Sequence, residues 1–307
     1  MKKEKIQELI SRMTLEEKAG MCSGADFWHL KGIERLGIPQ VMVTDGPHGI
    51  RKQAEEADHL GINESEKAVC FPAGCATASS FDRDLIRRQG EILGQECQAM
   101  NVSTILGPAM NIKRSPLCGR NFEYYSEDPF VSAEMAAAMI EGVQSKHVGT
   151  SVKHFAANNQ EKRRMTNSSD MDERTLREIY LKGFEIAVKT AQPYAIMTSY
   201  NLINGTHAAN HYDMLQNVAR DEWGFEGFIM TDWYTSQDTT ALGMVSESGK
   251  YSYSDGVQCI KAGNDLQMPG CRKNVEDIVD GVKNGRITKA DLQRCAKHIL
   301  GIALKTI

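Results

Sequence analysis

The sequence lacks the uninterrupted apolar run of about 18 residues that a membrane-spanning helix requires. Its first 20 residues carry two early lysines and then alternate polar with apolar residues, so they do not have the apolar segment of a secretory signal. We therefore expect no membrane partner and a cytoplasmic location.

Motifs for metals, nucleotides and nucleic acids are also missing. The eight cysteines form no Cys-x-x-Cys pair, and no histidine stands at zinc-site spacing, which favours buried, reduced thiols and no metal. No Gly-x-Gly-x-x-Gly follows the first predicted strand, and no Walker-type loop is present, so no nucleotide cofactor is predicted. A net charge of −4 argues against nucleic acid as a partner and favours a neutral substrate.

Short apolar runs that alternate with helical patterns are what the sequence does contain. The apolar runs are residues 40–43, 103–106, 150–152, 195–198, 227–231 and 264–267, and the helical patterns include residues 84–100, 132–144, 173–190, 214–222 and 275–283. Strands that alternate with helices indicate a parallel sheet with crossover helices. The 307 residues suit one large α/β domain, preceded by short helices over about 1–24, where Thr14 and Glu17 form a predicted capping box.

Polar or glycine-rich residues follow each predicted strand at the same end. Examples are Asp45-Gly-Pro, Lys153-His-Phe, Ser199-Tyr-Asn and Asp232-Trp233. In a parallel barrel these ends converge on one face, where such folds carry their active sites. A doubly wound open sheet would spread them along one edge. We predict a TIM-type (β/α)8 barrel, irregular or collapsed around its first strands.

Asp232 is the leading candidate for chemistry. It ends an apolar strand and precedes Trp233, whose indole offers a flat face for stacking on a sugar ring. A carboxylate in this place can act as a nucleophile or general base. The residues alone equally allow Asp232 to cap a following helix.

Lys153 and His154 close another predicted strand. Successive strand residues point to opposite faces, so both can reach one pocket only if the backbone is irregular there, which we predict. Arg114 and Arg120 lie in a glycine- and proline-containing segment. One of them could bind substrate oxygens, although an ion pair with Glu123 or a nearby acid is the commoner role of a single arginine.

Five motifs in order resemble glycoside hydrolase family 3, in its β-glucosidase branch. They are Asp45-Gly-Pro-His-Gly-Ile-Arg51, the segment 119–129, Lys153-His-Phe, the segment 197–205 and the segment 224–233. The resemblance implies hydrolysis of terminal β-D-glucosyl residues, from a β-glucoside or short β-linked oligosaccharide, through a covalent intermediate on Asp232. It also implies that the subsite for the non-reducing-end sugar is lined by Asp45, Arg51, Arg120, Lys153, His154, Met197, Tyr200 and Trp233.

The proton donor of such a reaction has no match in the sequence. In β-glucosidases of this family it is a glutamate in a second α/β domain, which the resemblance places beyond residue 307, so we expect that domain to be absent. Alone, the barrel is expected to be weakly active or inactive, as a truncated chain, half of a split enzyme or a non-catalytic sugar-binding barrel. Apolar surface at the docking face would favour association, including a homo-oligomer.

Other activities fit the sequence less well. The β-N-acetylglucosaminidase branch uses a barrel histidine in a loop like Lys-His-Phe-Pro-Gly-His-Gly, and residues 153–161 lack its proline, glycine and second histidine. Glu161 stands in a stretch that resembles a structural part of the β-glucosidase branch, so we do not assign it proton transfer. A β-xylosidase and a Schiff-base aldolase using Lys153 are further alternatives.

Overall fold

The computed structural model describes residues 3–54, 63–238 and 251–306, and its centre is a curled parallel sheet. Strands β2, β3, β4, β6 and β9 run parallel in this order, and β1 pairs antiparallel with β2. The strands are β1 (His29–Leu30), β2 (Val41–Asp45), β3 (Thr104–Leu106), β4 (Gly149–Phe155), β6 (Ala195–Thr198) and β9 (Phe228–Thr231). The barrel prediction is confirmed, including an irregularity at the first strands.

Isolated backbone bridges continue the sheet from β9 back to β1. They join Met230 to Leu266, Ser23 to Gln267, and Gly24 to Leu30. The run predicted as a strand at residues 264–267 therefore takes part in the sheet through single bridges. Because the closing segments and β1 are short, the barrel is irregular on this side.

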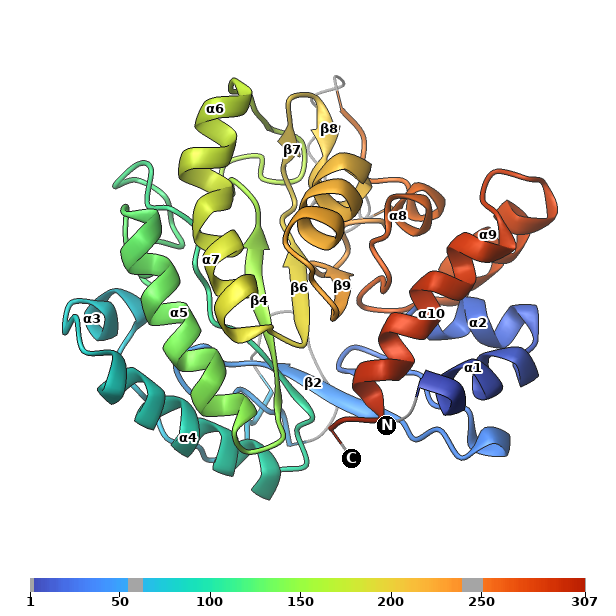
Figure 1. Ribbon diagram of the computed structural model, residues 1–307, viewed down its shortest axis with the longest axis horizontal. Helices are drawn as coiled ribbons and strands as arrows, with labels where there is room; N and C mark the ends of the chain where they lie inside the picture. The colour runs from blue at the N-terminus through green and yellow to red at the C-terminus, as the bar shows by residue number, and fades with distance from the viewer. Residues whose placement is uncertain (1–2, 55–62, 239–250, 307) are drawn as a thin grey trace.

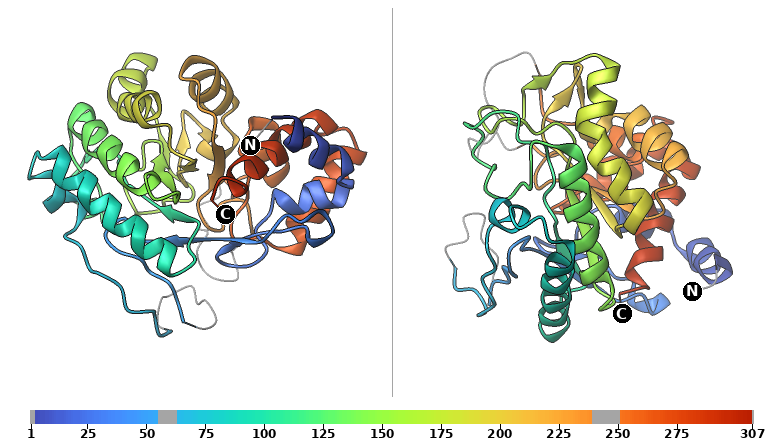
Figure 2. Two further views of the ribbon diagram at one scale, coloured as in Figure 1. Left: turned by 60° about the horizontal axis from the view of Figure 1, so that its bottom comes forward. Right: turned by 60° about the vertical axis from the view of Figure 1, so that its left-hand side comes forward.

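Helices surround the sheet in two groups (Figure 1). On one flank α4, α5 and α7 lie side by side; on the other, α1 packs on α10 and α2 packs on α9 and α10 (Figures 1 and 2). The helices are α1 (Lys3–Arg12), α2 (Leu15–Met21), α3 (Gly74–Ala78), α4 (Arg83–Ala99), α5 (Pro129–Gln144), α6 (Glu173–Thr175), α7 (Lys182–Ala191), α8 (Gly256–Ala262), α9 (Arg272–Lys283) and α10 (Lys289–Ala303), with π-helical turns at η2 (Leu176–Leu181) and η4 (Asp213–Glu222).

Local sequence signals explain where several helices begin. Thr14 and Glu17 form the predicted capping box of α2, and Thr288 and Asp291 form another at α10. Asp128 caps α5 through the amides of its first turn, with Pro129 at the first helical position. Such caps satisfy backbone N–H groups that have no partner within the helix.

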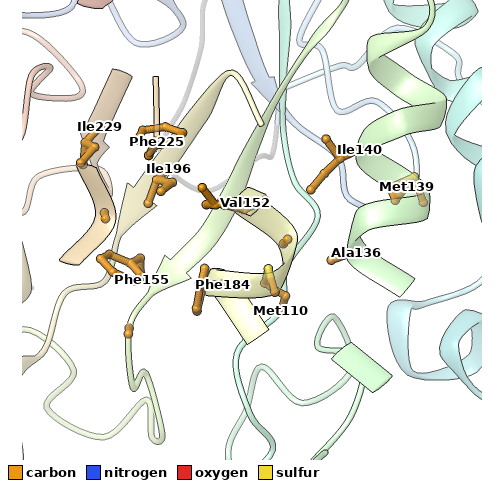
Figure 3. Packing of buried hydrophobic residues seen from close by; sticks show 14 of the residues in the cluster. Met110, Ala136, Met139, Ile140, Val152, Phe155, Phe184, Ile196, Phe225 and Ile229 are labelled. Carbon is orange, nitrogen blue, oxygen red and sulfur yellow. The ribbon is translucent and has the colours of Figure 1, made fainter. Parts of the chain in front are cut away.

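The outer core lies between the sheet and the flanking helices (Figure 3). Val152 of β4 and Ile196 of β6 point away from the barrel axis into this layer. Phe155 at the end of β4 packs edge-on against Phe184 of α7, with ring centroids 5.0 Å apart. Because these residues are fully buried, burial of apolar area holds α7 on the sheet.

The register of β4 shifts just before the strand ends. Val152 pairs with Ile196, but Phe155 pairs with Thr198, so three steps along β4 match two along β6. This is a bulge of one residue, which lets consecutive side chains point differently from those of a regular strand. The irregularity predicted at Lys153 and His154 is confirmed, and the peptide bond between them is cis.

Candidate active site

The predicted site residues gather at the carboxyl ends of the parallel strands. Asp45 ends β2, and Lys153 and His154 lie just before the end of β4. Tyr200 follows β6, and Asp232 directly follows β9. Asp45 and Arg51 have side chains 36% and 42% exposed, whereas Asp232 is 10% and His154 1% exposed. The first pair therefore lies on the solvent side of the site and the second pair lies at its base.

A glycine loop shapes the solvent side. Gly46 has φ +142° and Gly49 φ +132°, and a Cβ at Gly49 would lie 2.2 Å from the carbonyl oxygen of Val69. Only glycine fits such backbone without strain. The loop returns so that the amide of Arg51 donates to the carbonyl of Asp45 (2.9 Å). This places the Arg51 guanidinium 3.9 Å from the Asp45 carboxylate.

Asp45 of β2 and Lys153 of β4 form an ion pair in which the lysine is buried and the aspartate is partly exposed. The Nζ of Lys153, whose side chain is 4% exposed, donates to the Oδ1 of Asp45 at 3.1 Å. Burial alone would raise the pKa of Asp45, but Lys153, Arg51 and Arg120 together hold it below its ordinary value. Asp45 is thus a fixed acceptor for the hydroxyl groups of a ligand.

His154 of β4 is almost completely buried, and it lies beside Asp232. Its backbone amide donates to the Oδ1 of Asn111 (2.6 Å), and its Nε2 lies 3.4 Å from the Oδ2 of Asp232. Burial, together with the charges of Arg120, Lys153 and Arg164, holds the pKa of His154 well below its usual value. The imidazole is therefore neutral at neutral pH, and it is not one of the cations of the site.

Arg120 forms the ion pair with Glu123 that the sequence suggested, and it also lies near Asp232. Its Nε donates to Glu123, and its Nη1 lies 3.8 Å from the Oδ2 of Asp232. The carboxylate of Glu123 therefore orients the guanidinium toward the site. Arg114, the other candidate, is exposed and outside this cluster.

Asp232 does not cap a helix. Its Oδ1 accepts from the amide of Trp233 (2.7 Å), and residues 233–236 form a turn. Burial raises the pKa of Asp232 and outweighs the opposing effects of Arg120, Arg164 and Lys153. Removal from water is therefore the largest effect on the pKa of this carboxyl group.

Tyr200 and Arg164 complete the base of the site. The Tyr200 hydroxyl lies against Asp232, and burial together with the charge of Asp232 raises its pKa well above the usual value. The guanidinium of Arg164 lies 4.5 Å above the Tyr200 ring, which is a cation–π contact. Arg164 escaped the sequence analysis because it lies in a loop without periodicity, and its nearness to residues 153–154 in the sequence was the only signal.

Trp233 and Met197 are placed by the packing of the barrel. The Trp233 ring lies 5.4 Å from that of Trp28, its Nε1 donates to the carbonyl of Phe27 (2.9 Å), and it is 7% exposed. Met197 is 1% exposed and packs inside the barrel. Their contact with a sugar stays a prediction.

Within the described ranges, no three or more His, Cys, Asp or Glu side chains form a group that could hold a metal ion. Five of the eight cysteines are buried and all eight are free thiols. In the same part of the chain, no helix has the length and apolar character needed to cross a bilayer.

Comparison with known sequences gives one family. The Glycosyl hydrolase family 3 N terminal domain matches residues 21–302. The thermostable beta-glucosidase B of Acetivibrio thermocellus is 51% identical over 298 residues, which are 97% of this chain and 37% of that protein. An exo-alpha-(1->6)-L-arabinopyranosidase of Bifidobacterium breve is 46% identical over the same shares.

Solved structures agree with the sequence matches. The beta-glucosidase 3B of Thermotoga neapolitana, in complex with glucose, superposes on this chain with a TM-score of 0.87 at 38% identity. The match covers 98% of this chain and 42% of the Thermotoga chain. The chain thus spans less than half the length of each of these relatives.

Proposed function

The chain belongs to glycoside hydrolase family 3, and from this premise we propose that it is the barrel domain of a retaining, exo-acting β-glycosidase of the β-glucosidase type. The observation that carries the proposal is the buried carboxylate of Asp232 at the end of β9. It faces Arg120 and His154 at 3.8 and 3.4 Å, while Asp45, paired with Lys153, is ready to bind hydroxyl groups.

The chemistry starts with attack of an Asp232 oxygen on the anomeric carbon of the terminal sugar. The new ester bond forms as the glycosidic C–O bond breaks, and the leaving oxygen takes a proton from an acid. Water, deprotonated by the same residue, then attacks the anomeric carbon and releases Asp232. Asp45 binds the sugar ring at its hydroxyls and so fixes which face meets the nucleophile.

The acid/base is proposed to come from a second α/β domain, as a glutamate. Carboxylates of the described residues near Asp232 are already bound to cations: Asp45 to Lys153, and Glu123 to Arg120. A general acid needs the opposite surroundings, because it must hold its proton near neutral pH. The greater length of the relatives supports a donor outside residues 1–307.

The test is to incubate the chain with an activated 2-deoxy-2-fluoro-β-glucoside and weigh it intact. The fluorine slows breakdown of the intermediate, and a good leaving group does not need protonation. A mass increase of one fluoroglucosyl group, located on Asp232 by peptide mapping, is the expected result. An unmodified chain that still binds glucose or gluconolactone by calorimetry would instead support the non-catalytic sugar-binding alternative.

A second substrate is favoured by one comparison, the arabinopyranosidase that is 46% identical. An α-L-arabinopyranoside with an activated leaving group should therefore be tested beside the β-glucoside and a β-xyloside. The ratio of trapping rates decides the sugar preference. The aldolase alternative has no support from the family matches. Cytoplasmic location and homo-oligomer formation stay predictions.

A further inference from the structure

The two ring nitrogens of His154 have different surroundings. Nδ1 lies 3.0 Å from the hydroxyl of Tyr124. Nε2 makes no hydrogen bond within the described residues and lies 3.4 Å from the Oδ2 of Asp232. Because the side chain is 1% exposed, bulk water cannot replace a missing hydrogen bond at either nitrogen. The position of the ring proton therefore decides whether Nε2 presents a hydrogen-bond donor or a lone pair to the site.

A series of hydrogen bonds leads from the protein to Nδ1. The Nδ2 of Asn158 donates to the Oε1 of Glu161 (3.1 Å) and to the hydroxyl oxygen of Tyr124 (2.8 Å). An ionised carboxylate only accepts, so Glu161 requires the amide of Asn158 to face it with its NH2 group. Glu161 is itself held by Arg164 at 2.9 Å.

The direction of the series follows from the single proton of Tyr124. Its oxygen accepts from Asn158, and among the described residues its own proton can be donated to the Nδ1 of His154, 3.0 Å away. If Nδ1 carried a proton instead, the Tyr124 proton would be left without an acceptor in a buried place. The bare Nε2 would also point its lone pair at a carboxylate oxygen of Asp232.

We propose that Glu161, Asn158 and Tyr124 form a relay of positioning residues that holds His154 as the neutral tautomer with its proton on Nε2. The proposal rests on the proposed function of Asp232 as nucleophile. In the free site the Nε2–H lies near Asp232 without a hydrogen bond to it, and in the occupied site it is the donor to a substrate hydroxyl. Glu161 thus acts through Asn158 and Tyr124 and transfers no proton to substrate.

A neutral donor suits the nucleophile beside it. An imidazolium would add a full positive charge 3.4 Å from Asp232 and would lower the reactivity of the carboxylate toward an anomeric carbon. A neutral N–H beside the carboxylate adds no such charge. Three cations already surround the ring, Arg120, Lys153 and Arg164, and they oppose its protonation.

The tautomer can be measured directly, without any substrate. The full chain, labelled with ¹⁵N-histidine, gives a two-bond ¹H–¹⁵N spectrum in which a bare ring nitrogen and a protonated one are well separated. His154→Gln identifies the His154 signals. We expect the Nε2–H pattern in the unmodified chain at neutral pH.

Two variants test the relay in different ways. Tyr124→Phe removes the donor to Nδ1, so the Nδ1–H tautomer should become populated and the trapping rate with the 2-fluoro-glucoside should fall about 10-fold, the scale of one hydrogen bond. Asn158→Asp, when ionised, accepts the Tyr124 proton and should turn His154 to the Nδ1–H tautomer. As a control, Tyr125→Phe removes the hydroxyl group from the buried neighbour of Tyr124. It should change neither the His154 tautomer nor the trapping rate.

An Nδ1–H or imidazolium spectrum in the unmodified chain would overturn the proposal. So would an unchanged Nε2–H spectrum in both folded relay variants, with folding checked by thermal unfolding. The unmodified chain could show the Nε2–H pattern, and the variants lose it, while no sugar is trapped. That result would support the relay and contradict the assignment of Asp232 as nucleophile.

Discussion

The Nε2 of His154 lies 3.4 Å from the Oδ2 of Asp232, although the two residues belong to β4 and to the turn after β9. Both side chains are buried, and burial moves their pKa values in opposite senses, down for the imidazole and up for the carboxyl group. The site therefore holds a neutral donor beside a carboxylate that has lost most of its water. This pairing underlies the first two predictions.

Asp232→Asn should reduce the rate of trapping by the 2-fluoro-glucoside by about 10⁴-fold or more, as expected when a nucleophile is removed. The same change should raise the melting temperature, because a neutral amide replaces a carboxylate whose ionisation is disfavoured by burial. Intact mass and thermal unfolding check the two effects. Retained trapping in this variant would show that another residue attacks.

The trapping rate should fall at low pH with a midpoint above the ordinary aspartate pKa of about 3.9, because Asp232 reacts only when ionised and its pKa is raised. Asp232 and Asp45 should change the free energy of unfolding with pH in opposite directions. The contribution of Asp232 is present below its unfolded pKa and is lost as pH rises through the raised pKa. The contribution of Asp45 is present above its unfolded pKa and is lost as pH falls through the lowered pKa. An acid midpoint below 3.9 would contradict the assignment of Asp232.

The ion pair between Lys153 and Asp45 should be energetically coupled in sugar binding. Lys153→Met and Asp45→Asn should each slow trapping, and the double variant should be less impaired than the two separate effects predict. We expect a coupling of roughly 1 kcal/mol, within the range for side chains in direct contact. Additive effects would mean that the two groups bind the sugar independently. Trapping rates of the four proteins complete the cycle.

Asp265 should be critical for closing the barrel. It is fully buried and accepts from Arg220 (2.6 Å), His298 (3.0 Å) and the amide of Ile229 (2.8 Å), so it ties the closing segment to β9 and α10. Asp265→Ala should destabilise the fold by roughly 3–5 kcal/mol, because Arg220 would remain as a buried, unpaired charge. Urea unfolding measures the change.

A matched control is the exposed pair of Arg272 and Glu276, whose side chains are 92% and 55% exposed. Arg272→Ala should change the unfolding free energy by no more than about 0.5 kcal/mol, as is usual for a surface pair one helical turn apart. A similar loss in both variants would show that Asp265 contributes through charge in general and not through its buried position.

Elements with strong local signals were predictable from the sequence. The capping box at Thr14 and Glu17 formed as predicted, because its two hydrogen bonds are made within four residues. The runs at 195–198 and 227–231 became β6 and β9, because apolar stretches of this length between helices are stable as buried parallel strands. The run at 264–267 joined the sheet by single bridges, since its pairing depends on the distant residues Ser23 and Met230.

Of the site, the sequence by itself determined which side chains stand at strand ends, and hence that Asp45, Lys153 and Asp232 share one face. The parallel topology enforces this, because all carboxyl ends lie on the same side of the sheet. Only the tertiary structure decided which of them touch. The bulge in β4 places Lys153 beside Asp45 and His154 beside Asp232. The loop residues Glu123, Asn158 and Glu161 orient their partners through hydrogen bonds that no periodic sequence pattern predicts. It also decided that the pKa of Asp232 is raised, because burial is a property of the packed site and not of the residue.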